Sequence, residues 1–167
     1  MDEYLIVANQ TLGGEKLAQT VRERIERGES SFYVLVPTAP PHHESGWAGG
    51  FVPYEGMSAY EARTWSEQES ERRQATLDAA RSLAQQRLTQ MTEAIEGAGA
   101  RADGSVCDPD PLAALKATMA EHSFTEVIIS TLPARLSRWL KMDLPSRVAR
   151  ASSAPVTTIE AASTPEE

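Results

Sequence analysis

The chain has 167 residues, of which 41% are hydrophobic, and this is the size and apolar content of a single compact domain. Its formal net charge of −8 excludes a general nucleic-acid surface or an anionic membrane surface, because both require clustered positive charge. One cysteine excludes an internal disulfide framework, and the first ten residues lack the pattern of a secretion signal, so we expect a cytoplasmic protein without a nucleic-acid or membrane partner.

The N-terminal part predicts two buried strands with a helix between them. Residues 4–8 form a short apolar run, and residues 31–37 form a second one that ends in proline. Between them, apolar residues recur every four positions, which is the stripe of a helix packed on one side: Leu17, Val21 and Ile25.

Residues 38–57 are rich in proline, glycine and histidine and show no period, so they are either a flexible lid over a site or a disordered loop. A long helix is predicted over residues 58–97. Its charged first half is expected to project, while its second half carries an apolar stripe for packing: Leu77, Ala80, Ala84, Leu88, Met91 and Ile95.

The C-terminal part continues the alternation. Residues 101–106 predict a weak edge strand, and Asp110 and Pro111 predict the N-cap and first residue of another helix. Two further strands are expected over residues 124–130 and 155–159.

Strict alternation of strands and helices predicts an α/β domain over residues 1–160, with right-handed crossovers and a doubly wound, five-stranded parallel sheet. Residues 161–167 are expected to be a disordered tail. In such sheets a ligand lies at the carboxyl ends of the strands, where the strand order reverses.

A basic segment follows the fourth strand. Residues 135–150 hold one acidic and five basic side chains, the latter being Arg135, Arg138, Lys141, Arg147 and Arg150. Guanidinium groups bind phosphate oxygens through paired donors, so this segment predicts an anion site. Arg135 and Arg138, in the loop beside the expected cleft, are either anion ligands or members of surface ion pairs.

Two further features bear on the cleft. Gly13 and Gly14, at the start of the first helix, offer main-chain amides to an anion. Asp143 is interpreted as the N-cap of the last helix rather than as a ligand.

Motifs of catalysis are missing from the sequence. Neither a G-x-S-x-G elbow nor a P-loop is present, and the three histidines have no partners at metal-ligand spacing. Cys107 is interpreted as a small buried residue. The sequence therefore favours a binding protein over an enzyme and predicts no metal site.

Several short motifs together resemble those of the universal stress proteins. V-C-D-P-D-P at 106–111 resembles the family's G-D-P before a helix, and E-V-I-I-S-T at 126–131 resembles D-x-I-V-x-G-T. L-S-R-W-L at 136–140, S-R-V at 146–148 and A-P-V at 154–156 resemble L-S-R-L-L, A-E-R-V and C-P-V. The resemblance implies a Rossmann-like fold of the adenine nucleotide alpha hydrolase type, with strand order 3-2-1-4-5.

The nucleotide motif of that family is altered here. ATP-binding members carry G-x2-G-x9-G-[S/T], with glycines that let main-chain amides approach the phosphates. The three glycine positions align with Ser130, Pro133 and Met142, the hydroxyl position with Asp143, and an acid of the first strand is replaced by Asn9. Proline removes an amide donor and the carboxylate repels phosphate, so ATP binding is expected to be weak or absent.

The resemblance implies a non-enzymatic binding module that senses a nucleotide, ATP or AMP, or another small phosphorylated ligand. The alternative is a protein-interaction scaffold with a vestigial pocket, working through its dimer face or the half-helix 58–75. The last strand, Val156 to Ile159, is expected to pair two copies as a homodimer. The predicted ligand-binding residues are Asn9, Gly13, Gly14, Val36, Ser130, Thr131, Arg135, Ser137 and Arg138.

Overall fold

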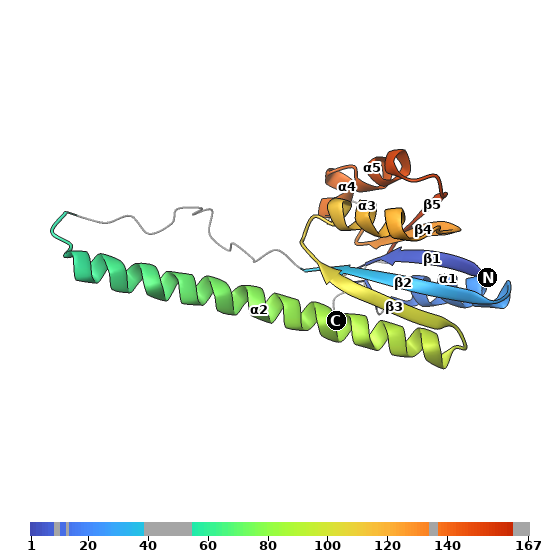
Figure 1. The fold of residues 1–167 in the computed structure, drawn as a ribbon, viewed down its shortest axis with the longest axis horizontal. Coiled ribbons are helices and arrows are strands. Elements are labelled where there is room, and N and C mark those ends of the chain that lie inside the picture. Colours follow the sequence, from blue (N-terminus) through green and yellow to red (C-terminus); the bar gives the residue numbers. More distant parts are fainter. Residues whose placement is uncertain (9–10, 13, 39–54, 134–136, 162–167) are drawn as a thin grey trace.

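The computed structural model of the chain describes residues 1–8, 11–12, 14–38, 55–133 and 137–161, with Arg138 described in its backbone only. Its centre is one parallel sheet in the order β3-β2-β1-β4-β5 (Figure 1). This confirms the predicted fold class and strand order. The strands are β1 (Asp2–Val7), β2 (Ser30–Pro37), β3 (Arg101–Cys107), β4 (Glu126–Thr131) and β5 (Val156–Glu160).

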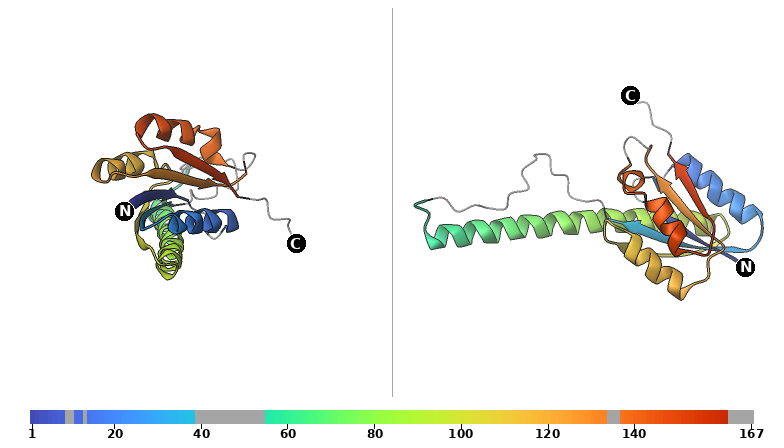
Figure 2. Two further views of the ribbon diagram at one scale, coloured as in Figure 1. Left: turned by 90° about the vertical axis from the view of Figure 1, so that its right-hand side faces the viewer. Right: turned by 90° about the horizontal axis from the view of Figure 1, so that it is seen from above.

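Helices cover both faces of the sheet (Figure 2). Side chains of α1 (Glu15–Glu26) and α2 (Ala59–Gly97) pack in one cluster, and those of α3 (Leu112–Glu121) and α5 (Leu144–Ala151) pack in the other. A short helix, α4 (Arg138–Lys141), precedes α5. The right-handed crossovers from β1 to β2 and from β2 to β3 place α1 and α2 on one face of the sheet. After β3 the chain crosses back over the sheet to β4 and continues to β5, so the remaining helices lie on the other face.

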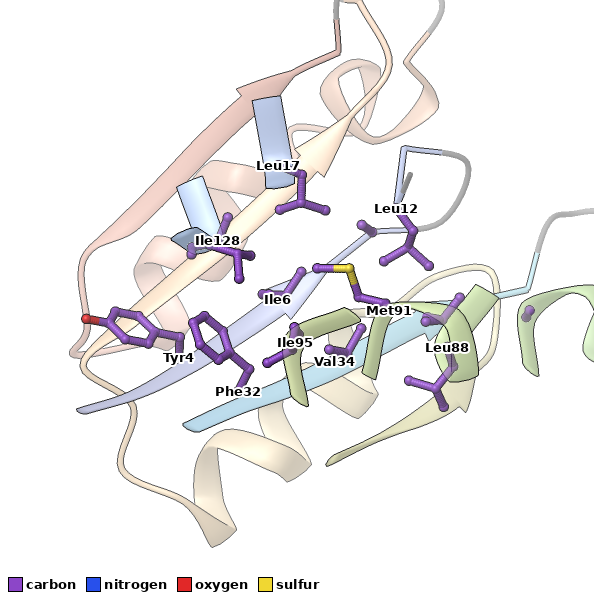
Figure 3. Packing of buried hydrophobic residues seen from close by; sticks show 14 residues of the cluster. Tyr4, Ile6, Leu12, Leu17, Phe32, Val34, Leu88, Met91, Ile95 and Ile128 are labelled. Atoms are coloured by element: carbon purple, nitrogen blue, oxygen red, sulfur yellow. The ribbon is translucent and has the colours of Figure 1, made fainter. Parts of the chain in front are cut away.

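The alternating strand residues divide the core into two apolar clusters. Tyr4, Ile6 and Ile128 point to the α1 and α2 face, where the ring of Tyr4 stacks on Phe32 with centroids 5.1 Å apart (Figure 3). Leu5 and its alternating neighbours in β1 and β4 point to the α3 and α5 face. β1 and β4 are thus buried on both sides, as their continuous apolar runs predict.

Only the C-terminal third of α2 packs on the sheet. The helix has 39 residues, and its N-terminal part extends well beyond the sheet (Figure 1). The expectation that the packed stripe includes Leu77 is wrong, because 53% of that residue is exposed. The fully packed positions are Ala84, Leu88, Met91 and Ile95.

α2 lies close to β3 at a glycine. A Cβ atom on Gly104 would lie 2.3 Å from the carbonyl oxygen of Val34 and 2.5 Å from Cδ1 of Leu88. Any larger residue would therefore separate β3 from α2 or from β2.

The two outer strands, β3 and β5, differ in the hydrogen bonds of the main-chain groups that face away from the sheet. In β3 the carbonyl of Cys107 accepts a hydrogen bond from the amide of Thr38, just after β2, so the main-chain groups of Cys107 face β2. Main-chain groups alternate in direction along a strand, so those of Gly104 face away from β2. The outward amide of Gly104 donates to Oδ1 of Asp103 at 2.8 Å. In β5 the carbonyl of Pro155 accepts from β4, so the groups of Val156 and Thr158 point outward. The sheet edge at β3 is therefore partly closed by a side chain.

Three local expectations are adjusted by the structure. Arg138 begins α4 instead of lying in the loop before it. Asp143 occupies the N-cap position of α5 but makes no capping bond; its φ is 57° and its carboxylate lies 3.9 Å from Arg150. Asp110 Oδ1 accepts from the amide of Leu112 at 3.1 Å, so it caps α3 from one residue further out than expected.

Among the described residues, no helix combines the length and the apolarity needed to cross a bilayer.

Candidate functional site

The strand order reverses between β1 and β4, which places the ligand-binding position of a doubly wound fold at their carboxyl ends. From this point the chain leaves β1 toward α1 on one face and leaves β4 toward α4 and α5 on the other. The described residues nearest this reversal carry a set of buried hydroxyl groups.

The first hydroxyl pair joins the two strand ends. Ser130 Oγ donates to Thr11 Oγ1 at 2.8 Å, and the two residues are 2% and 6% exposed. Each hydroxyl can both donate and accept, so the pair satisfies part of its own hydrogen-bonding capacity away from water. It fixes the segment after β1 against the end of β4.

The second hydroxyl pair fixes the segment after β4. Thr131 and Ser137, both buried, share a short hydrogen bond between their hydroxyls. Ser137 Oγ also accepts from the amide of Leu140 at 3.1 Å, and its own amide donates to the carbonyl of Pro133 at 2.9 Å. Ser137 therefore anchors the start of α4 to the strand.

The N-terminus of α1 opens onto the same edge of the sheet. Its N-cap is Gly14, which has no side chain to cap the first turn, and the amide of Gly14 donates to the carbonyl of Thr11 at 2.9 Å. The first amides of a helix have no partner within it and carry partial positive charge. They can therefore interact with an anion.

A lysine lies on this rim as well. Lys16 Nζ donates to the carbonyl of Glu160 at 3.1 Å, beside the point where the amide of Ala161 donates to Thr131. The ammonium group of Lys16 thus lies near the carboxyl ends of β4 and β5.

The structure brings together part of the predicted site. Ser130, Thr131 and Ser137 lie at the switch point, and Gly14 begins α1 beside them. Val36, near the carboxyl end of β2, is fully buried in the cluster under α1 and α2.

Four predicted site residues lie, wholly or with their side chains, outside the described part of the structure. Asn9, Gly13 and Arg135 lie outside the described residues, and of Arg138 only the backbone in α4 is described.

Sequence reasoning missed two residues of this rim, Thr11 and Lys16. Thr11 lies in a turn with no motif of its own, and its pairing with Ser130 is a contact between residues 119 positions apart. Lys16 could have been found from its place in the first turn of a helix that begins at the expected cleft, where a cation is not the usual choice.

The reactivity of the described polar groups follows from their hydrogen-bond partners and their burial. The partners of the four hydroxyls are other hydroxyls and main-chain groups, so none is activated by a carboxylate or an imidazole. Burial, and to a lesser extent Asp108 and Asp110, raise the pKa of the Cys107 thiol to about 12, which keeps it protonated and unreactive at neutral pH. Within the described ranges no three His, Cys, Asp or Glu residues gather where a metal ion could bind.

The fold and the position of this site define a doubly wound α/β domain with a polar switch point. No protein-family model matches the chain, and neither does any curated protein. Among solved structures, a universal stress protein from Archaeoglobus fulgidus has 10% sequence identity and a TM-score of 0.52, with 95% of this chain and 93% of that one covered.

A hypothetical protein whose biochemical function was assigned from its structure gives the same identity and TM-score, with 98% of each chain covered. A universal stress protein from Archaeoglobus fulgidus in complex with dAMP is less similar, with a TM-score of 0.47 and 11% identity over 95% of this chain and 97% of that one. This chain has the universal stress protein fold.

Proposed function

We propose that the chain is a non-enzymatic binding module that takes a small phosphorylated ligand, such as AMP, at the switch point between β1 and β4. The observation that supports this proposal best is the buried hydroxyl cluster of Thr11, Ser130, Thr131 and Ser137, which holds the segments after both strands beside the uncapped start of α1. Hydroxyl groups, helix amides and a lysine are all donors to phosphate oxygens.

The size of the ligand follows from what the rim lacks. Pro133 has no amide hydrogen, and Asp143 has a side-chain carboxylate where the nucleotide motif has a hydroxyl. A triphosphate needs many main-chain donors, whereas one phosphate can be held by a few side chains. We therefore expect a monophosphate to bind better than ATP.

Calorimetric titration of AMP and of magnesium ATP tests this proposal. We expect AMP affinity to fall about tenfold in Lys16→Ala, Arg135→Ala and Arg138→Ala, since one charge-assisted bond contributes about 1.5–3 kcal/mol and about 1.4 kcal/mol is a factor of ten. Lys116→Ala is the control, because this exposed lysine lies in α3. Tight ATP binding that none of the three substitutions weakens would contradict the proposal.

The second candidate function is an interaction scaffold with a vestigial pocket. It is favoured by the fact that the hydroxyls of the switch point hydrogen-bond one another, as they would in a site that no longer needs a ligand. Failure of every phosphate compound to bind would favour this function, and it would leave the open edge of β5 as the working surface.

The predicted lid at 38–57 lies almost wholly outside the described residues. It stays a prediction: amide exchange in this segment should slow when AMP saturates the protein, and equal exchange with and without AMP would contradict a lid.

A further inference from the structure

A cavity of about 450 Å³ lies between α1 and the C-terminal part of α2, next to the core cluster under these helices. This volume is within the range of small-molecule sites. The residues that bound it come from α1, from the C-terminal part of α2 and from Leu12, so the cavity is distinct from the cluster of hydroxyls at the switch point.

The floor of the cavity is apolar. It is formed by Leu12, Val21, Met91 and Ile95, which belong to the core cluster under these helices. Figure 3 shows Leu12, Met91 and Ile95 of this set. A groove of this kind favours a ligand with a hydrocarbon body, because covering exposed apolar surface contributes about 25 cal/mol for each Å² buried.

Alanines line the walls, and their small side chains leave the space open. Ala18 comes from α1, Ala94 comes from α2, and Ala98 is the C-cap residue that follows α2. The cavity follows α2 from Arg87 to this C-cap, which at 1.5 Å per residue is about 16 Å along the helix axis. A long, narrow ligand fits this shape better than a compact ring.

The polar groups at the cavity are cationic or neutral. Arg22 of α1 and Arg87 of α2 line it, together with Gln90. Arg22 is paired with Glu15 at 3.1 Å, but both side chains are more than half exposed, and such a pair contributes little and can be exchanged for another anion. In a chain of net charge −8, two arginines beside one apolar groove mark a place for a negative head group.

We propose that the groove between α1 and α2 binds an anionic amphiphile, a medium-length acyl chain that ends in a carboxylate. The acyl chain would lie over Val21, Met91 and Ile95, and the carboxylate would accept hydrogen bonds from Arg22 in place of Glu15. This site is independent of the proposed phosphate site.

Calorimetric titration with decanoate tests the inference, with decanol as an uncharged probe of the same chain length. We expect saturable binding of decanoate, binding of decanol at least tenfold weaker, and loss of most decanoate affinity in Ala94→Phe, because the ring fills the groove. Equal affinity for the two probes, or no decanoate binding by the wild type, would overturn the proposal.

Matched variants separate the groove from non-specific apolar surface. Ala79→Phe is the control for Ala94→Phe, since Ala79 is exposed on the same helix and does not bound the cavity. It should bind decanoate like the wild type. Arg22→Gln keeps the groove open and should lower decanoate affinity severalfold while leaving decanol unchanged. A decanoate affinity that is the same in Ala94→Phe and Ala79→Phe would contradict the inference. A decanoate affinity that neither Ala94→Phe nor Arg22→Gln lowers below that of the wild type would contradict it as well.

Discussion

At the scale of single residues, a buried ion pair joins three elements on the α1 side of the sheet. Nε of Arg24 donates to Oε2 of Glu126 at 2.6 Å and a second guanidinium nitrogen donates to Oε1 at 3.0 Å, while Thr157 donates to the same carboxylate. About nine-tenths of both charged side chains is buried. The two parallel bonds tie α1 to the first residue of β4, and Thr157 adds β5.

Replacing one member of this pair should destabilise the fold. Among the described acidic side chains, Glu126→Gln leaves the buried Arg24 with only the half-exposed carboxylate of Glu23, 3.7 Å away, so we expect a loss of about 2–3 kcal/mol in the free energy of unfolding at neutral pH. Urea denaturation measures it. Glu121→Gln, at an exposed glutamate of α3, is the control and should change stability little; equal losses in both variants would rule out a special role for the pair.

The same pair predicts a pH dependence. Hydrogen bonding to Arg24, helped by the bond from Thr157, lowers the pKa of the Glu126 carboxyl below its ordinary value. The folded pKa therefore lies below the unfolded one of about 4.3, so the stabilisation is complete above that pH and is lost as the pH falls through the folded pKa. The difference in unfolding free energy between wild type and Glu126→Gln should shrink as urea denaturation is repeated at successively lower pH values; a constant difference would contradict this assignment.

At the scale of elements, the contact of α2 with the sheet depends on the missing side chain of Gly104. The close approach of Val34 and Leu88 leaves no room for a methyl group. The neighbour at 2.3 Å is a main-chain oxygen of β2, which cannot move without disturbing the β2 and β3 pairing.

Gly104→Ala should therefore cost about 1–3 kcal/mol of unfolding free energy. Thermal or urea denaturation would measure it. Gly97→Ala is the matched control, because a Cβ atom there meets nothing within 4 Å and the residue ends α2. The control should be neutral or slightly stabilising. If Gly104→Ala is as stable as the control, the contact is looser than described.

The elements are also where sequence reasoning succeeded best. Apolar runs predict four of the strands and the weaker run at 101–106 predicts β3. Apolar stripes predict the helices over 15–26 and 59–97, and the Asp110 and Pro111 start signal predicts the helix over 112–121, all to within a few residues. The exception, Leu77, is apolar and in phase with the stripe, but the sheet ends before α2 reaches it. Periodicity reports which face of a helix can pack and not how far its partner extends.

The site was predictable only in part. Ser130, Thr131 and Ser137, which the structure places at the switch point, could be predicted because their motifs lie at the end of a recognisable strand or directly after it. The role of Thr11 depends on its hydrogen bond to Ser130, which follows from the pairing of β1 with β4. No spacing in the sequence indicates that contact. Val36 lies in the core because β2 is buried on both faces, so its place at a strand end did not bring its side chain to the rim.

At the scale of the whole molecule, the described sheet has two outer strands that are not equivalent. β3 carries charged residues at Arg101 and Asp103, and the Asp103 carboxylate occupies an outward amide. The segment Val156–Ile159 of β5 has no charged side chain, and the main-chain groups of Val156 and Thr158 point away from β4. Charges and occupied amides oppose strand pairing, so β5 is the edge suited to a second copy.

We predict a homodimer formed by pairing of two β5 strands. Thr158→Pro removes an outward amide without breaking a bond to β4, so it should give a monomer, while Thr158→Val keeps the amide and should remain dimeric. Sedimentation at micromolar concentration distinguishes the two. A monomeric wild type, or a Thr158→Pro protein that is still dimeric, would refute the prediction.

The hydrogen bond from Gly104 to Asp103 then has a consequence for stoichiometry. A chain with two open sheet edges could add copies at both and grow into a fibre, whereas a chain with one such edge uses it up in a single two-fold contact. Because one carboxylate occupies an outward amide of β3, we expect the predicted pairing through β5 to stop at two copies, so that a higher protein concentration would increase the dimer fraction without producing longer assemblies.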